Sequence, residues 1–282
     1  MRRGRPVVWL AALAGLASAC QRVSGLEPVG PIPDVGKLSQ GALDSELARL
    51  QHSLNSVLSF SFFITKSMKT QLRAGRLSGT LPILYVFLAR SGKTIDEVTL
   101  VKLDSQGVAR AEGEKIDGHA DDGVKIVFSG SDGKRQTLYY FSTDLSDGGV
   151  KKSGFLRFCD GLGRGDALLK SASYLLHSGG FADVRTFILD HSVAIVQDDS
   201  GIPVRHFDRD QWQLQAFGNY LGPISIFPGR YQRDLMALYR NGRAGPLEFG
   251  IGYRWRPRQS NLLLALKGGA RTAQDQPEAG PR

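Results

Sequence analysis

Residues 182–207, ADVRTFILDHSVAIVQDDSGIPVRHF, place a helix, a strand and a polar turn in immediate succession. Val184, Phe187 and Ile188 share one face at helical spacing, which predicts a helix that packs by this face. The apolar run 193–197 predicts a strand, and the Asp-Asp-Ser-Gly that follows it predicts a sharp turn. A helix that leads directly into a strand indicates a mixed α/β fold.

Similar patterns on both sides of this region extend the α/β interpretation. Helices are expected over residues 39–77, 166–177, 182–192 and 231–239; strands are expected over 83–89, 95–103, 124–128, 137–142, 193–197, 203–207 and 212–217; residues 248–255 alternate like a strand, and 260–266 suit a strand or a helix. The Gly-containing segment 129–133 predicts a hairpin between two of the strands. We therefore expect one main α/β domain over residues 39–267, with a mixed sheet and flanking helices, followed by a disordered tail over 268–282.

The composition is that of an ordinary globular protein, because 41% of the 282 residues are hydrophobic and 22% are charged. It excludes a collagen, a disulfide-dense mini-protein, a coiled coil and a polytopic membrane protein. The formal charge is +9, but the basic residues are scattered and form no patch or known module. We therefore expect no nucleic-acid partner.

The first 20 residues, MRRGRPVVWLAALAGLASAC, have the pattern of an export signal. Arginines come first, then an apolar run too short to span a bilayer, and then small residues. The end of this segment resembles a bacterial lipobox, with Ala17 where leucine is usual. We expect residues 1–19 to be a signal peptide, Cys20 to become an acylated, palmitate-bearing first residue, and residues 20–38 to form an irregular lead.

Two outcomes stay open at Cys20. Lipidation would anchor the protein to a membrane, and the resemblance to enterobacterial lipoproteins implies, from Gln21, the outer membrane facing the periplasm. Ala17-Ser18-Ala19 is also an ordinary cleavage site, and cleavage there would leave a periplasmic or secreted protein. In that case Cys20 and Cys159 would be able to form a disulfide.

The turn after the 193–197 strand is the strongest candidate site. Asp198 and Asp199 are adjacent carboxylates, and His206 lies a few residues further along. These three residues suit an acid–base pair in a cleft, or carboxylate ligands of a cation such as Ca²⁺. Glu27, between an apolar run and a rigid proline turn, is a second candidate.

The same turn also has a purely structural interpretation. Asp198 and Ser200 would cap the turn, Gly201 would adopt a positive φ, and Arg205 would neutralise a buried carboxylate. The chain has neither G-x-S-x-G nor H-E-x-x-H, and its two cysteines match no zinc spacing. We therefore expect no cofactor and no metal.

Several strings together resemble an uncharacterised family of exported bacterial proteins and lipoproteins. They are GLEPVGPIPDV (25–35), ILYVFLAR (83–90), YYFSTDLSD (139–147), QDDSGIPVRHF (197–207), and FGIGYRW and SNLLLAL near the end. The resemblance covers most of residues 25–266 and implies export without implying an activity. It also implies that relatives carry a longer segment, with its own strand and Gly/Asp turn, before GLEPVG, and that this chain lacks that strand.

Two functions follow from these features. The first is a cell-envelope lipoprotein of unknown molecular function, a binding or structural module whose partner is an envelope component or a protein. The alternative is an exported, hydrolase-like enzyme that uses Asp198, Asp199 and His206.

Overall fold

A ten-stranded mixed sheet forms the centre of the protein in this computed structural model, which describes residues 7–10, 20–25, 28–60, 77, 79–242, 244–254 and 256–268. The strand order is β4-β3-β5-β6-β2-β1-β7-β8-β10-β9. The strands are β1 (Val7–Leu10), β2 (Cys20–Gly25), β3 (Thr94–Asp104), β4 (Ala109–Ala111), β5 (Ala120–Ser129), β6 (Arg135–Ser142), β7 (Gly165–Leu169), β8 (Ser192–Gln197), β9 (Trp212–Gly218) and β10 (Asn261–Lys267). The predicted α/β fold with a mixed sheet is confirmed.

The middle of the sheet is parallel and its two sides are antiparallel. Strands β6, β2, β1, β7 and β8 run in the same direction. β5, β3 and β4 extend one side, and β10 and β9 extend the other, all by antiparallel pairing. The carboxyl ends of the five parallel strands therefore meet at one edge of the sheet, where α/β folds commonly bind ligands.

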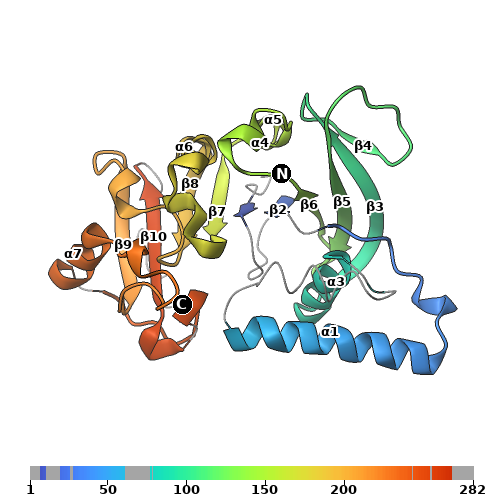
Figure 1. Ribbon diagram of the computed structural model, residues 1–282, viewed down its shortest axis with the longest axis horizontal. Helices are drawn as coiled ribbons and strands as arrows, with labels where there is room; N and C mark the ends of the chain where they lie inside the picture. The colour runs from blue at the N-terminus through green and yellow to red at the C-terminus, as the bar shows by residue number, and fades with distance from the viewer. Residues whose placement is uncertain are drawn as a thin grey trace, which may run out of the picture.

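Helices cover the sheet in separate groups (Figure 1). They are α1 (Gln40–Phe60), α3 (Leu81–Arg90), α4 (Asp147–Val150), α5 (Phe155–Gly161), α6 (Ala182–His191) and α7 (Arg233–Asn241). In the view of Figure 1, α4, α5 and α6 gather above β7 and β8, α3 and α1 lie below the β3–β6 side, and α7 lies at the β9 end. No helix within the described ranges is long and apolar enough to cross a membrane.

Two main groups of buried side chains support this arrangement. One surrounds β7, β8 and β10, where Leu169, Ile195 and Ala265 are almost completely buried. The other lies between α3 and the β5–β6 hairpin, with Leu81 and Phe128 at its centre. Each group is held by apolar side chains from several elements, so burial rather than local propensity fixes how the elements pack.

Several predicted elements are confirmed. The 124–142 hairpin is formed by β5 and β6, which pair from Ser129↔Arg135 onward. The helix predicted over 182–192 is α6, and the strand after it is β8. Strands β3, β9 and β10 and helix α7 also lie close to their predicted positions.

The strand predicted over 83–89 is wrong, because this segment forms helix α3. A short, continuous apolar run does not separate a strand from a buried helix. Pro82 lies in the first turn, where proline suits a helix, and Leu81, Leu84 and Leu88 are buried at helical spacing.

The helix predicted over 166–177 is also wrong. Gly165–Leu169 is strand β7, between β1 and β8, and a 3₁₀ turn follows over Ala172–His177. The parallel pairing overrides the local helical pattern. Ser173 and Tyr174 then adopt φ values of 52° and 55°, which no right-handed helix accommodates.

Three further differences concern shorter segments. Residues 203–207 hold a 3₁₀ turn over Val204–His206 instead of a strand, and the alternating 248–255 segment holds a 3₁₀ turn over Gly252–Arg254. The lead over 20–38 is not wholly irregular, because Cys20–Gly25 precedes its first proline and forms β2. The predicted 39–77 helix is described as far as Phe60; residues 61–76 and the tail beyond 268 lie outside the described residues.

The helical assignment of α3 makes Leu88 a core residue and leaves its neighbour Ala89 exposed. We expect Leu88→Ala to lower the free energy of unfolding by about 2–5 kcal/mol, because it leaves a cavity against the β5–β6 hairpin. Urea denaturation measures the change, with Ala89→Ser as the control. Equal effects of the two substitutions would contradict this packing.

Candidate functional site

The candidate site lies at the carboxyl edge of the parallel strands. Lys170 and Ser171 follow β7, and Asp198, Asp199 and Ser200 follow the neighbouring parallel strand β8. In the sheet, β1 lies between β2 and β7, and β8 follows β7. The strand order therefore runs from β1 to β2 in one direction and from β7 to β8 in the other. Open α/β sheets form ligand crevices at such a reversal, which here lies beside Lys170.

The Asp-Asp-Ser-Gly turn is held by its own side chains, as the structural interpretation predicts. Asp198 Oδ1 accepts hydrogen bonds from the backbone N–H of Ser200, at 3.0 Å, and from the Ser200 hydroxyl. The Gln197 amide bonds both the N–H and the C=O of Ile202. Gly201 is needed for space and not for a positive φ, because a Cβ there would lie 2.3 Å from Gln197 Oε1.

Lys170 neutralises this turn instead of Arg205. Its Nζ donates to Ser200 Oγ at 2.9 Å, lies 3.1 Å from Asp198 Oδ2, and sits 3.2 Å from the centroid of the Tyr253 ring. The side chain of Lys170 is 16% exposed and that of Asp198 only 1%. Burial lowers the pKa of Lys170, while the charge of Asp198 acts in the opposite direction.

Asp199 connects the turn to three other parts of the fold. Its carboxylate accepts hydrogen bonds from Tyr174 OH at 2.8 Å and from Asn261 Nδ2 at 3.2 Å. Its backbone oxygen accepts from Gln232 Nε2 at 2.8 Å and lies 3.1 Å from His177 Nε2. Burial raises the pKa of Asp199 to about 6, and the neighbouring Asp198 carboxylate adds to the increase.

The turn after β7 is strained and tightly packed. Ser173 and Tyr174 are the non-glycine residues with positive φ among those described. Such backbone conformations cost about 1–3 kcal/mol each and persist only where the surroundings enforce them. Tyr174 is completely buried and stacks on Tyr253 with ring centroids 5.3 Å apart, while the N–H of Ser173 donates to Tyr253 OH at 2.6 Å.

The structure brings some of the predicted site residues together and separates others. Asp198, Asp199 and Ser200 lie in one network. His206 lies in the Val204–His206 turn with no described contact to either carboxylate, and its buried Nε2 has no hydrogen-bond partner there. Arg205 is exposed and has no described carboxylate within ion-pair distance. Glu27 lies outside the described residues, and the catalytic assignment of Asp198, Asp199 and His206 stays a prediction.

Several residues of this network escaped the sequence analysis. Lys170 and Tyr174 fell within a predicted helix, so nothing indicated that they would reach the turn after β8. Recognising 165–169 as a strand parallel to β8 would have placed Lys170 beside Asp198. Asn261 and Tyr253 lie far along the chain and approach only through the β8–β10 pairing and the fold around it.

The arrangement is closed rather than reactive. Asp198, Asp199 and Ser200 are each at most 6% exposed and already bonded to protein groups. Within the described ranges, no cluster of three or more His, Cys, Asp or Glu side chains could hold a metal ion.

Comparison with protein-family models, curated proteins and solved structures found no match to this chain.

Removing the Lys170 charge tests the importance of this network. Lys170→Met leaves Asp198 buried without its counter-ion, and we expect it to lower the free energy of unfolding by about 3–5 kcal/mol. Lys151→Met is the matched control, because Lys151 is 72% exposed and its pair with Asp183 contributes about 0–1 kcal/mol. Chemical denaturation of both variants measures the difference. A similar, small loss in both would show that the ion pair does not support the fold.

His177 makes the network sensitive to acid. Burial lowers the pKa of His177 to about 4 from its ordinary 6.5, helped by the charges of Arg230 and Arg205 and opposed by the Asp199 carbonyl and by Asp198. A lowered imidazole pKa contributes stability above pH 6.5 that is lost as the pH falls toward 4. The advantage of the wild type over His177→Gln in unfolding free energy should therefore shrink between pH 7.5 and 4.5. An advantage that grows in acid would contradict this environment.

Proposed function

We propose that this chain is a non-catalytic lipoprotein of the bacterial cell envelope, whose α/β domain binds an envelope component or a protein partner. The observation that carries the proposal is the sequence of residues 1–20, with its arginines, short apolar run, small residues and Cys20. In this proposal a lipid on Cys20 holds the domain at the outer membrane, facing the periplasm.

The closed polar network favours binding over catalysis. An acid–base mechanism needs carboxylates that reach a substrate, yet Asp198 and Asp199 are buried and engaged with Lys170, Tyr174 and Asn261. The network is better suited to fixing the carboxyl edge of β7 and β8 as a rigid platform. A rigid platform lowers the ordering cost of binding a ligand elsewhere on the same face.

The proposal has a structural consequence for the sheet. Strand β1 is formed by Val7–Leu10, within the predicted signal peptide, and pairs with β2 on one side and β7 on the other. Cleavage before Cys20 removes β1 and exposes the backbone N–H and C=O groups of both neighbours. In the mature protein these groups would bond water, another strand, or each other through direct pairing of β2 with β7.

A second candidate function rests on a different observation. The Lys170 Nζ to Ser200 Oγ distance of 2.9 Å suits a hydrolase in which serine is the nucleophile and lysine its base. Such a lysine must be neutral, and burial lowers the pKa of Lys170 against the opposing charge of Asp198. Ser200, however, is 0% exposed, so a substrate does not reach its hydroxyl. A fluorophosphonate probe that labelled wild-type protein but not Ser200→Ala would support the hydrolase against the binding protein; we expect no labelling.

Membrane attachment through Cys20 is the direct prediction of the lipoprotein proposal. Expressed in a bacterium, the wild-type chain should sediment with membranes, and Cys20→Ala should move to the soluble fraction because it has no acyl acceptor. Cys159→Ala is the matched control and should stay with the membranes, because Cys159 is buried in the α5 region of the core. Membrane attachment of Cys20→Ala equal to that of the wild type would rule out the anchor.

A further inference from the structure

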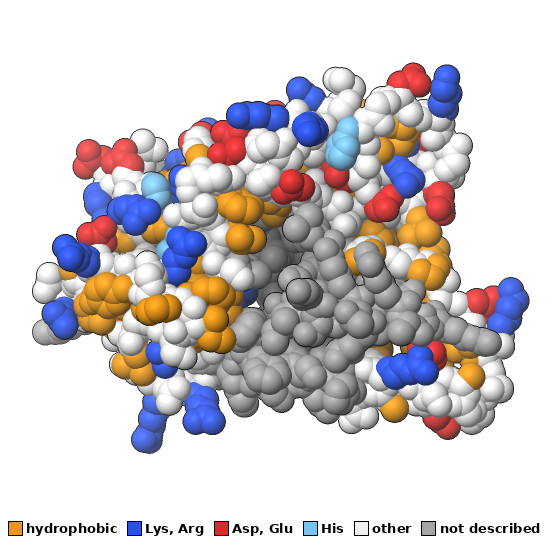
Figure 2. All heavy atoms as spheres, in the orientation of Figure 1, with side chains coloured by type: hydrophobic (Ala, Val, Ile, Leu, Met, Phe, Trp, Pro, Cys, Tyr) orange, Lys and Arg blue, Asp and Glu red, His pale blue; other side chains and the backbone are white. Residues whose placement is uncertain are grey.

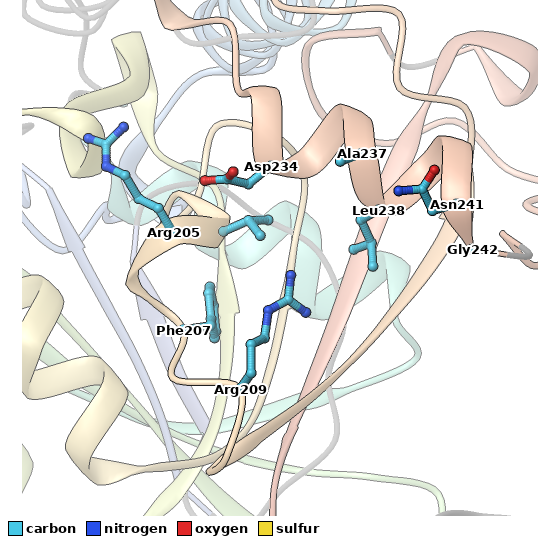
Figure 3. Close-up of a pocket in the computed structure, with 9 residues that line it drawn as sticks. Arg205, Phe207, Arg209, Asp234, Ala237, Leu238, Asn241 and Gly242 are labelled. Atoms are coloured by element: carbon cyan, nitrogen blue, oxygen red, sulfur yellow. The ribbon is translucent and has the colours of Figure 1, made fainter.

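The molecule has an open groove about 570 Å³ in volume between α7 and residues 204–209 (Figure 3). Its lining includes Arg205, Phe207, Arg209, Asp234, Ala237 and Leu238. This volume lies within the range of small-molecule sites, which are about 300–1,000 Å³. The groove is separate from the Lys170 network, whose residues do not line it.

Arg205 and Arg209 outnumber Asp234 in the groove lining and give it a net positive charge. Both are exposed, and among the described residues neither has a carboxylate oxygen within 4.0 Å, although Asp234 lies in the same groove. Figure 3 shows Arg209 extending toward α7 and Arg205 pointing outward at the rim. Figure 2 shows Lys and Arg side chains at this end of the molecule, with Asp and Glu side chains among them.

The surroundings add to this positive character. Arg205 is near enough to help lower the pKa of both His177 and His206, after burial as the main cause. Arg185 also acts on His206, and Arg230 on His177, although neither arginine lines the groove. Because cations outnumber carboxylates in the groove lining, the groove attracts anions and raises their local concentration.

The floor of the groove is apolar. Phe207 is buried and packs edge-on against Trp212, and Leu238 and Ala237 come from the facing side of α7. A free inorganic anion would leave this apolar floor uncovered. An organic anion would pair its charge with a guanidinium and cover the apolar floor with its body.

We propose that this groove binds a soluble small organic anion, with its carboxylate or phosphate held by Arg209, attracted by Arg205 at the rim, and its apolar body resting on Phe207 and Leu238. Asp234 disfavours a second acidic group elsewhere on the ligand. The proposal deepens the non-catalytic binding function above by naming the class of ligand.

Calorimetry with 1-naphthyl phosphate, inorganic phosphate and 1-naphthol tests both parts of the site. Wild-type protein should bind 1-naphthyl phosphate at a single site and more tightly than either fragment. Arg209→Gln should weaken this binding at least about tenfold, because it removes the charge-assisted hydrogen bonds. Arg240→Gln, an exposed arginine of α7 outside the groove, is the matched control and should bind like the wild type.

Ala237→Trp provides a second test that leaves the charges in place. Ala237 is exposed on α7, so tryptophan there should fill the groove, retain the wild-type melting temperature and abolish binding. Absence of wild-type binding at millimolar 1-naphthyl phosphate, or equal affinity in Arg209→Gln, would overturn the proposal. Preferential binding to phosphatidylglycerol vesicles that depends on Arg209 would also overturn it, because it would show that Arg209 binds a lipid surface. Because binding is measured without reference to acylation, failure here is distinct from failure of the Cys20 anchor.

Discussion

The buried ion pair between Lys170 and Asp198 is the constraint on which the carboxyl edge of the sheet depends. Neither charge can remain in this environment alone, because the desolvation of an unpaired buried ion costs several kcal/mol. Ser200 and the Tyr253 ring complete the surroundings of the ammonium group, and Asp199 extends the network to Tyr174 and Asn261. The turns after β7 and β8 are therefore held as one unit, including the strained backbone at Ser173 and Tyr174.

This arrangement separates the rigid and the accessible parts of the molecule. The paired carboxylates that look most like an acid–base site are the ones the fold itself uses, and they are closed to solvent. The open surface lies beside them, where Arg205 and Arg209 border the groove under α7. Gln232 connects the two regions, because its side chain bonds the backbone of both Asp199 and Val204. In the proposed function, stability and recognition thus depend on neighbouring but different side chains.

The sequence predicts this fold best where local pattern and tertiary pairing agree. The β5–β6 hairpin and the α6–β8 unit carry clear periodicity, and the Asp198–Gly201 turn follows from its residue types. The hydrophobic pattern predicts the wrong element for α3, because a continuous apolar run suits a strand or a helix. It is also wrong for β7, where pairing with parallel neighbours overrides the helical spacing. The second failure concealed Lys170. Side chains that meet only through strand order, such as Lys170, Asp198 and Asn261, cannot be grouped from one sequence without the topology.

The N-terminal segment has two incompatible roles, since Val7–Leu10 is both part of a predicted export signal and a strand between β2 and β7. The mature protein can retain only one of them. The most direct measurement is the intact mass of the protein extracted from bacterial membranes. The lipoprotein account predicts a chain that begins at Cys20 and carries the mass of its acyl groups. A chain that retains residues 1–19, or one that begins at Cys20 without added mass, would contradict it.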